Sequence, residues 1–276
     1  YMKNIYLCYP EGKHKALTMS YDDGKEADRR LIDIFNKNKI KATFHLNGGF
    51  IGQDYTDKIK VHGDRIRENE IKKLYEGHEV ATHTYSHPTI ERCPLSQVIN
   101  QIVEDRKILE SIVGYPVLGL SYPNGSYSDR IKEILPRLDI KYSRVVEDTG
   151  KFDLPKDLYE WKATCHHGHD LLKLSDEFLS LHKKQYLYLF YVWGHSYEFD
   201  RDNNWALIEE FAKRVGNRDD IWYATNIEIV YYLERYDKLR FSIDGSFVYN
   251  PSFESVWISV DDKIIEVKGG EQVSLR

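Results

Sequence analysis

The sequence predicts an α/β fold, a (β/α) barrel of about seven strands that carries a small C-terminal β appendage. Apolar runs typical of strands alternate with apolar patterns at helical spacing, which favours a parallel sheet. About seven such repeats favour a barrel over an open sheet. After Asp237 the pattern changes to short alternating runs such as Val256–Val260. We therefore predict a barrel over residues 1–238 and an accessory β segment over residues 239–276.

The barrel elements follow from local patterns taken in chain order. Strands are expected where apolar, β-branched and aromatic residues run together, at residues 16–21, 41–46, 79–82, 117–122, 141–146, 161–164, 185–193 and 221–223. Helices are expected where apolar residues recur every three or four positions, at residues 25–38, 66–76, 94–113, 128–137, 171–182, 203–215 and 225–235. Gly77 and Gly114 each follow a helix, and glycine commonly ends one.

Composition narrows the class of protein. The chain has 276 residues, of which 41% are hydrophobic, so it can bury a core. The net charge of -5 does not favour nucleic-acid binding, and no apolar run reaches the length of a membrane span. Its three cysteines form neither a metal knuckle nor a disulfide framework. No signal peptide is visible, and because the chain begins at Tyr1 we expect a trimmed or mature form, which leaves localisation open.

Two adjacent carboxylates mark the end of the first barrel strand. Asp22 and Asp23 follow the apolar run directly, and Gly24 follows them. Neighbouring residues of a strand point to opposite sides, so the strand must end here if both acids serve one site. Glycine accepts the backbone angles that such an ending requires. Acids at the carboxyl end of a buried strand predict a polar site at the mouth of the barrel, whereas an acidic surface turn is the alternative.

His83 and His87 follow another strand and complete a possible metal site. Four-residue spacing resembles the helical pair of zinc peptidases, but Pro88 disfavours a helix there, so we expect a turn. Two imidazoles and one carboxylate leave positions open on a catalytic zinc. Hydrogen-bonded surface histidines are one alternative. A non-haem iron oxygenase is another, although alternating helices do not favour its β-sandwich setting.

These stretches resemble the polysaccharide deacetylase family with the NodB-homology domain, carbohydrate esterase family four. The resemblance rests on Ser20-Tyr21-Asp22-Asp23-Gly24, Lys41-Ala42-Thr43-Phe44 and His83-Thr84-Tyr85-Ser86-His87, and it covers about residues 14–237. It implies an incomplete (β/α) barrel, Asp22 as the general base, and Asp23, His83 and His87 as ligands of a divalent metal, with zinc expected. It also implies removal of N- or O-acetyl groups from sugar polymers.

The later motifs of the family are only partly matched. In Ser121-Tyr122-Pro123-Asn124-Gly125, Ser121 stands where the family has an arginine that orients the catalytic aspartate. The resemblance implies that the backbone N–H of Asn124 holds the oxyanion, with Tyr122 beside the substrate. Glu160-Trp161 is the expected equivalent of an Asp-Trp motif, with Trp161 at the substrate. The apolar strand ending at His195 matches the motif of the general acid, and Trp193 is a candidate sugar platform, with core packing as the alternative.

We therefore predict a metal-dependent carbohydrate deacetylase whose partner is an acetylated glycan. Two alternatives remain: an amidohydrolase acting on a small N-acyl or cyclic amide, and a non-catalytic carbohydrate-binding protein, which Ser121 favours. His166, His167 and His169 are expected at the rim or surface rather than around a second metal. Glu198 and Asp200 are expected to be solvated loop acids.

Overall fold

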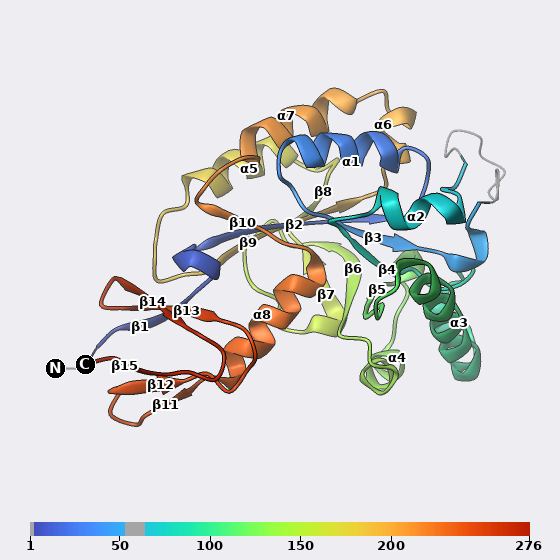
Figure 1. Cartoon of the computed structure of the whole chain (residues 1–276). Coiled ribbons are helices and arrows are strands. Elements are labelled where there is room, and N and C mark those ends of the chain that lie inside the picture. The colour runs from blue at the N-terminus through green and yellow to red at the C-terminus, as the bar shows by residue number, and fades with distance from the viewer. Residues whose placement is uncertain (1–2, 53–63) are drawn as a thin grey trace.

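The computed structural model describes residues 3–52 and 64–276 and confirms the predicted α/β fold (Figure 1). The strands that build the barrel are β2 (Lys15–Asp22), β3 (Thr43–Leu46), β4 (Glu79–Thr82), β5 (Gly119–Ser121), β6 (Tyr142–Asp148), β7 (Trp161–Ala163), β8 (Cys165–His166), β9 (Tyr188–Gly194) and β10 (Ile221–Tyr223). All eight predicted strands are present, with ends that differ from the predictions by up to three residues.

The barrel strands form one parallel sheet in the order β7-β6-β5-β4-β3-β2-β9-β8, and β10 also pairs with β2. Strand β2 is long enough to hold two partners along one edge, β10 beside Lys15–Leu17 and β3 beside Ser20–Asp22. Every residue of β2 is buried. This strand is therefore the central support of the sheet, and its carboxyl end delivers the aspartate pair.

The sheet curls into a barrel, and β7 and β8 end its hydrogen-bonded path. These two short strands follow one another in the chain, separated only by Thr164. Side chains fill the interior: the Trp161 ring of β7 lies 4.9 Å from the Tyr191 ring of β9, centroid to centroid. The result is the incomplete barrel that the family resemblance implies, and its interior is packed with side chains.

Helices cover the outside of the sheet, as Figure 1 shows. They are α1 (Asp28–Lys37), α2 (Glu68–Leu74), α3 (Leu95–Val113), α4 (Asp129–Ile134), α5 (Leu171–Ser180), α6 (Tyr197–Arg201), α7 (Trp205–Val215) and α8 (Asn226–Lys238). The five-residue α6 was not predicted, because it is too short for an apolar period to be visible. Within the two described ranges, no helix combines the length and the apolar character needed to cross a membrane.

The C-terminal segment forms two small antiparallel sheets beside α8. Its strands are β11 (Arg240–Phe241), β12 (Phe247–Tyr249), β13 (Val256–Val260), β14 (Lys263–Val267) and β15 (Gln272–Ser274). Strand β1 (Ile5–Cys8), which was not predicted, pairs with β13, so the start of the chain joins this segment. The Tyr232 hydroxyl of α8 donates to the Cys8 carbonyl and accepts from the Trp257 N–H. The division at residue 238 stays a prediction.

Candidate metal centre and active site

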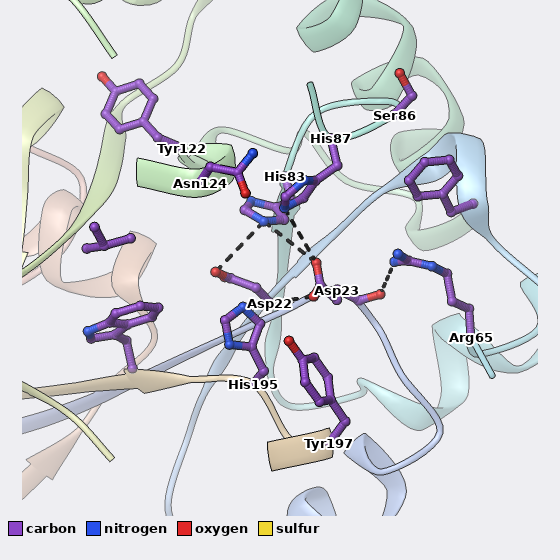
Figure 2. A pocket seen from close by; sticks show the side chains of 13 residues that line it. Asp22, Asp23, Arg65, His83, Ser86, His87, Tyr122, Asn124, His195 and Tyr197 are labelled. Atoms are coloured by element: carbon purple, nitrogen blue, oxygen red, sulfur yellow. Dashed lines mark hydrogen bonds and ion pairs between the residues drawn. The ribbon is translucent and has the colours of Figure 1, made fainter. Parts of the chain in front are cut away.

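The carboxyl ends of the barrel strands surround a pocket of about 480 Å³ (Figure 2). Four separate stretches of the chain supply its predicted polar groups: the end of β2, the turn after β4, the turn after β5 and the end of β9. The predicted site residues that line it are Asp22, Asp23, His83, His87, Tyr122, Asn124, Trp193 and His195. The parallel sheet therefore brings together residues that lie far apart in the sequence.

The backbone turns sharply between the two aspartates. Asp22 is the last residue of β2, and Asp23 follows with a φ of 82°. This left-handed conformation is unfavourable for residues other than glycine and is typical of functional sites. Because the chain turns here, both side chains reach the same pocket instead of pointing to opposite faces of the sheet. The Arg65 guanidinium donates to the Asp23 carbonyl, which supports the turn from the other side.

The two histidines stand on a turn rather than on a helix, as predicted. Strand β4 ends at Thr82, and both Thr84 and His87 have positive φ values, 67° and 54°. The His83 Nδ1 lies 2.8 Å from the Ser121 carbonyl oxygen, which can only accept, so Nδ1 carries the proton. The His83 Nε2 then has a free lone pair directed into the pocket. Such a hydrogen bond on the far ring nitrogen is usual for metal-ligating histidines.

Asp23, His83 and His87 fit a divalent metal ion. One ligand atom from each lies within 4.8 Å of the other two. The Asp23 Oδ1 is 3.7 Å from the His83 Nε2 and 4.0 Å from the His87 Nε2. Ligand atoms bound to one tetrahedral zinc at 2.0–2.1 Å lie about 3.3 Å apart, so small side-chain shifts suffice. The Asp23 Oδ1 is also buried without a hydrogen-bond partner among the described residues, which a cation would remedy.

Asp22 lies beside these three residues but is held by different groups. Its side chain is 3% exposed, and its Oδ1 accepts a hydrogen bond of 3.1 Å from the Ser121 Oγ. The Arg144 guanidinium, which is fully buried on β6, contacts the other carboxylate oxygen. The Trp193 ring lies 4.3 Å from the Arg144 guanidinium carbon and packs over it. Asp22 is thus an oriented carboxylate at the pocket wall.

The charges around Asp22 and Asp23 change the pKa values of these carboxyls more than burial does. Burial alone raises the pKa of both carboxyls, but the nearby Arg144 guanidinium, helped by the surrounding histidines, lowers that of Asp22 below its usual value. For Asp23, the pKa is likewise lowered against burial, chiefly by His195 and His83. Burial lowers the pKa of His83 to about 4, so this ring is neutral at pH 7. Two ionised carboxylates and a neutral imidazole are the forms that metal binding and proton acceptance require.

His195 lies across the two aspartates from His83 and His87, as Figure 2 shows. Its Nε2 lies 3.9 Å from the Asp23 Oδ2, and its Nδ1 lies 3.4 Å from the Glu198 Oε2. Burial acts to lower the pKa of His195, but Glu198 and the two aspartates raise it to about 9. An imidazolium at neutral pH can donate a proton.

The structure corrects the prediction about Glu198. This residue is not a solvated loop acid, because only 8% of it is exposed. No sequence pattern signals its burial, because the α6 turn that buries it is too short to recognise. Glu160, from the other expected motif, forms ion pairs with Lys132 and Lys162.

The predicted substrate-binding residues divide into two groups. Tyr122, Asn124 and Trp193 border the pocket, although the Trp193 Nε1 is already bonded to Asp148 at 2.9 Å. Trp161 does not border it, because the ring is 1% exposed and packs in the barrel interior. We therefore withdraw Trp161 as a substrate contact. The pocket-lining residues that sequence reasoning missed are Phe50, Arg65, Ser86, Val146 and Tyr197.

Together, fold and site define an incomplete (β/α) barrel with a candidate two-histidine, one-aspartate metal centre between a carboxylate and an imidazole. Residues 9–143 match the family model described as polysaccharide deacetylase, in line with the resemblance that the motifs show.

Curated relatives match somewhat less than half of the chain. The peptidoglycan-N-acetylmuramic acid deacetylase PdaC of Bacillus subtilis is 28% identical over 120 residues, 43% of this chain and 23% of its own length. The chitooligosaccharide deacetylase of Rhizobium leguminosarum bv. phaseoli is 28% identical over 132 residues, 48% of each chain. The chain thus spans less than half the length of these relatives.

Solved structures share the fold. A Mycobacterium smegmatis protein assigned as a polysaccharide deacetylase superposes with a TM-score of 0.58 at 16% identity, over 84% of this chain and 94% of its own. A mutant of Bacillus subtilis PdaC gives 0.50 at 19% identity, over 82% and 96%. At these identities the likeness supports the barrel assignment alone.

Proposed function

We propose that the protein is a metal-dependent hydrolase that removes acetyl groups from N-acetylated or O-acetylated carbohydrate polymers or oligosaccharides. The observation that carries the proposal is the convergence of Asp22, Asp23, His83, His87 and His195 in one pocket. This set contains three ligands, a proton acceptor and a proton donor, which are the groups that amide or ester hydrolysis requires. The match to the family model and the named activities of the relatives support the same chemistry.

Asp23, His83 and His87 would hold the ion, and zinc suits this ligand set best. A bound divalent ion supplies Lewis acidity, which lowers the pKa of water and polarises an acyl carbonyl. Three protein ligands leave room for water and substrate at the metal, as in other catalytic zinc sites.

Asp22 is the proposed general base. It does not belong to the ligand set, and its carboxylate is kept ionised by Arg144. Ser121 and Arg144 hold the two oxygens in a fixed orientation, so the carboxylate accepts the proton of the attacking water without reorganising. Arg144 thus supplies the cation that the family motif places at position 121.

Asn124 and His195 are proposed to act on the substrate. Asn124 borders the pocket with a φ of 55°, in the turn after β5, and its backbone N–H would hold the developing oxyanion. His195 would give its Nε2 proton to the departing amine, so that cleavage yields acetate and a free amino sugar. Tyr122 and Trp193 would bound the sugar-binding part of the pocket.

Acetate release tests the proposal. The zinc-loaded protein is assayed on acetylated chito-oligosaccharides, peptidoglycan and acetylated xylan, with chelator-treated protein and Asp22→Asn as controls. We expect zinc-dependent acetate release from at least one glycan, and little from either control. Release from small N-acyl or cyclic amides alone would favour the amidohydrolase alternative. Glycan binding with no release from any substrate would favour the non-catalytic alternative.

A further inference from the structure

Glu198 lies among three partly or fully buried histidines, one of which, His195, lines the active-site pocket. This group, called here the Glu198 cluster, consists of Glu198, His166, His167 and His195. The Glu198 Oε2 lies 2.8 Å from the His166 Nε2, 3.3 Å from the His167 Nε2 and 3.4 Å from the His195 Nδ1. The His195 backbone N–H also donates to it at 3.0 Å. A nearly buried carboxylate is stable only with such donors around it.

The hydrogen-bond partners of His166 determine which of its ring nitrogens carries the proton. The Gly168 backbone N–H donates to the His166 Nδ1 at 3.0 Å, so this nitrogen must accept. The proton of a neutral ring is then on Nε2, which donates to Glu198. His166 therefore acts as a fixed donor that anchors one carboxylate oxygen.

His167 supports the cluster from the barrel side. Its ring is 2% exposed and stacks on Phe199, with ring centroids 4.2 Å apart. It fills the space beneath Gly194, where an added Cβ would lie 2.2 Å from the His167 Nδ1. Because Gly194 has no side chain, the His167 ring can pack directly against it, next to His195.

We propose that Glu198 is a positioning residue that holds the His195 ring with Nδ1 toward the carboxylate and Nε2 toward the reacting leaving group. This inference rests on the proposed function, in which His195 is the proton donor. Glu198 belongs to helix α6, which begins just after His195, and its carboxylate accepts a hydrogen bond from the His195 backbone N–H. The Glu198 carboxylate and the His195 backbone are therefore fixed relative to each other. His166 and His167 act through Glu198 and do not touch the pocket.

A second metal in the Glu198 cluster is the competing interpretation, since His166, His167 and Glu198 also present close ligand atoms. Two observations favour the hydrogen-bonded arrangement. The His166 Nε2 carries a proton and so has no lone pair to offer. The Arg201 guanidinium lies 3.7 Å from the Glu198 Oε1, and a nearby cation opposes the binding of another.

The first test compares two leaving groups. A phenolate departs without protonation, whereas a sugar amine requires it. With zinc-loaded protein, we expect Glu198→Gln to lower kcat on an N-acetylated chito-oligosaccharide by about 10²-fold with little change in KM, and to leave 4-nitrophenyl acetate hydrolysis nearly unchanged. In a His195→Ala background, Glu198→Gln should have no further effect on the sugar substrate. The matched control is Glu209→Gln, which removes an exposed carboxylate paired with Arg30.

The second test does not depend on activity. In nitrogen-labelled zinc-loaded protein at a pH above about 9, where the His195 ring is neutral, we expect the ring to carry its proton on Nδ1, and Glu198→Gln to yield a mixture of both tautomers. Equal losses on both substrates, additive losses with His195→Ala, or an unchanged tautomer would overturn the proposal. Two bound zinc ions in the wild type and one in Glu198→Gln would also overturn it, in favour of a second metal site. A protein without acetate release but with the expected tautomer shift would contradict the proposed function and retain the role of Glu198.

Discussion

Ser121 and Arg144 are direct neighbours across the parallel β5–β6 pair. Residues opposite each other in adjacent strands project to the same face of the sheet, so both side chains point to the barrel interior. Ser121 donates to one oxygen of the Asp22 carboxylate, and Arg144 contacts the other. The positive charge that the family motif places on β5, at position 121, is therefore supplied by Arg144, its direct neighbour on β6.

The first prediction concerns this exchange of positions. Arg144→Ser should lower kcat for acetate release by about 10–100-fold, the usual effect of removing a group that orients a metal site, with zinc content unchanged. The double variant Ser121→Arg/Arg144→Ser returns a guanidinium to the same face from the neighbouring strand and should recover part of the loss. Arg144→Ser with full activity would show that the contact has no catalytic role.

The second prediction separates the two adjacent aspartates. Asp23→Asn should lose zinc, because a neutral amide is a poor ligand, and excess zinc should partly restore both occupancy and activity. Asp22→Asn should keep zinc and lose turnover by about 10²–10⁴-fold, the range for a lost general base. Metal analysis and acetate release on both variants check this. Zinc loss in Asp22→Asn alone would reverse the two roles.

The third prediction uses Glu79, a buried carboxyl at the opposite end of β4. Burial raises its pKa from 4.5 to about 7, although Thr43, Tyr142 and the Ile227 N–H all donate to it. Between these values the folded protein holds a proton that the unfolded chain has released. Unfolding then releases a proton, so the free energy of unfolding falls as pH rises from about 4.5 to about 7.

Urea denaturation of zinc-saturated protein at several pH values checks this sign. Glu79→Gln cannot titrate, so its stability should fall less steeply over the same window. Burial likewise raises the pKa of Asp28 and Asp105 to about 7, and both remain in the variant, so part of the slope should persist. A variant with the same slope as the wild type would contradict the assignment to Glu79.

The fourth prediction concerns the C-terminal segment. Val256 and Ile258 belong to the same buried cluster as Tyr9 and Tyr232, so the segment shares a core with the barrel. A chain truncated after Lys238 should unfold at a lower temperature than the full chain, because this apolar surface becomes exposed. It should still bind one zinc, since the three ligands lie at the far end of the sheet. Unchanged thermal stability would indicate an independent appendage.

Local patterns were sufficient for much of this protein. The helix and strand periods predicted the parallel sheet, and the strand ends identified Asp22, Asp23, His83, His87 and His195 as one site. This succeeds because parallel strands carry their carboxyl ends to one edge, so residues that follow strands meet whatever their separation in sequence. The resemblance to the family placed Tyr122 and Asn124 beside them.

The tertiary structure alone decided which charges orient the base and the acid. Neither Arg144 nor Glu198 belongs to a recognisable motif. Strand register brings Arg144 to Asp22, and the five-residue helix after β9 brings Glu198 to His195. Trp161 is the opposite case: it belongs to an expected motif, but its side chain is buried in the barrel interior and does not reach the pocket. Sequence periodicity determines which elements form, whereas register and curvature determine which side chains meet across the barrel, as Asp22 and Arg144 do although 122 positions separate them.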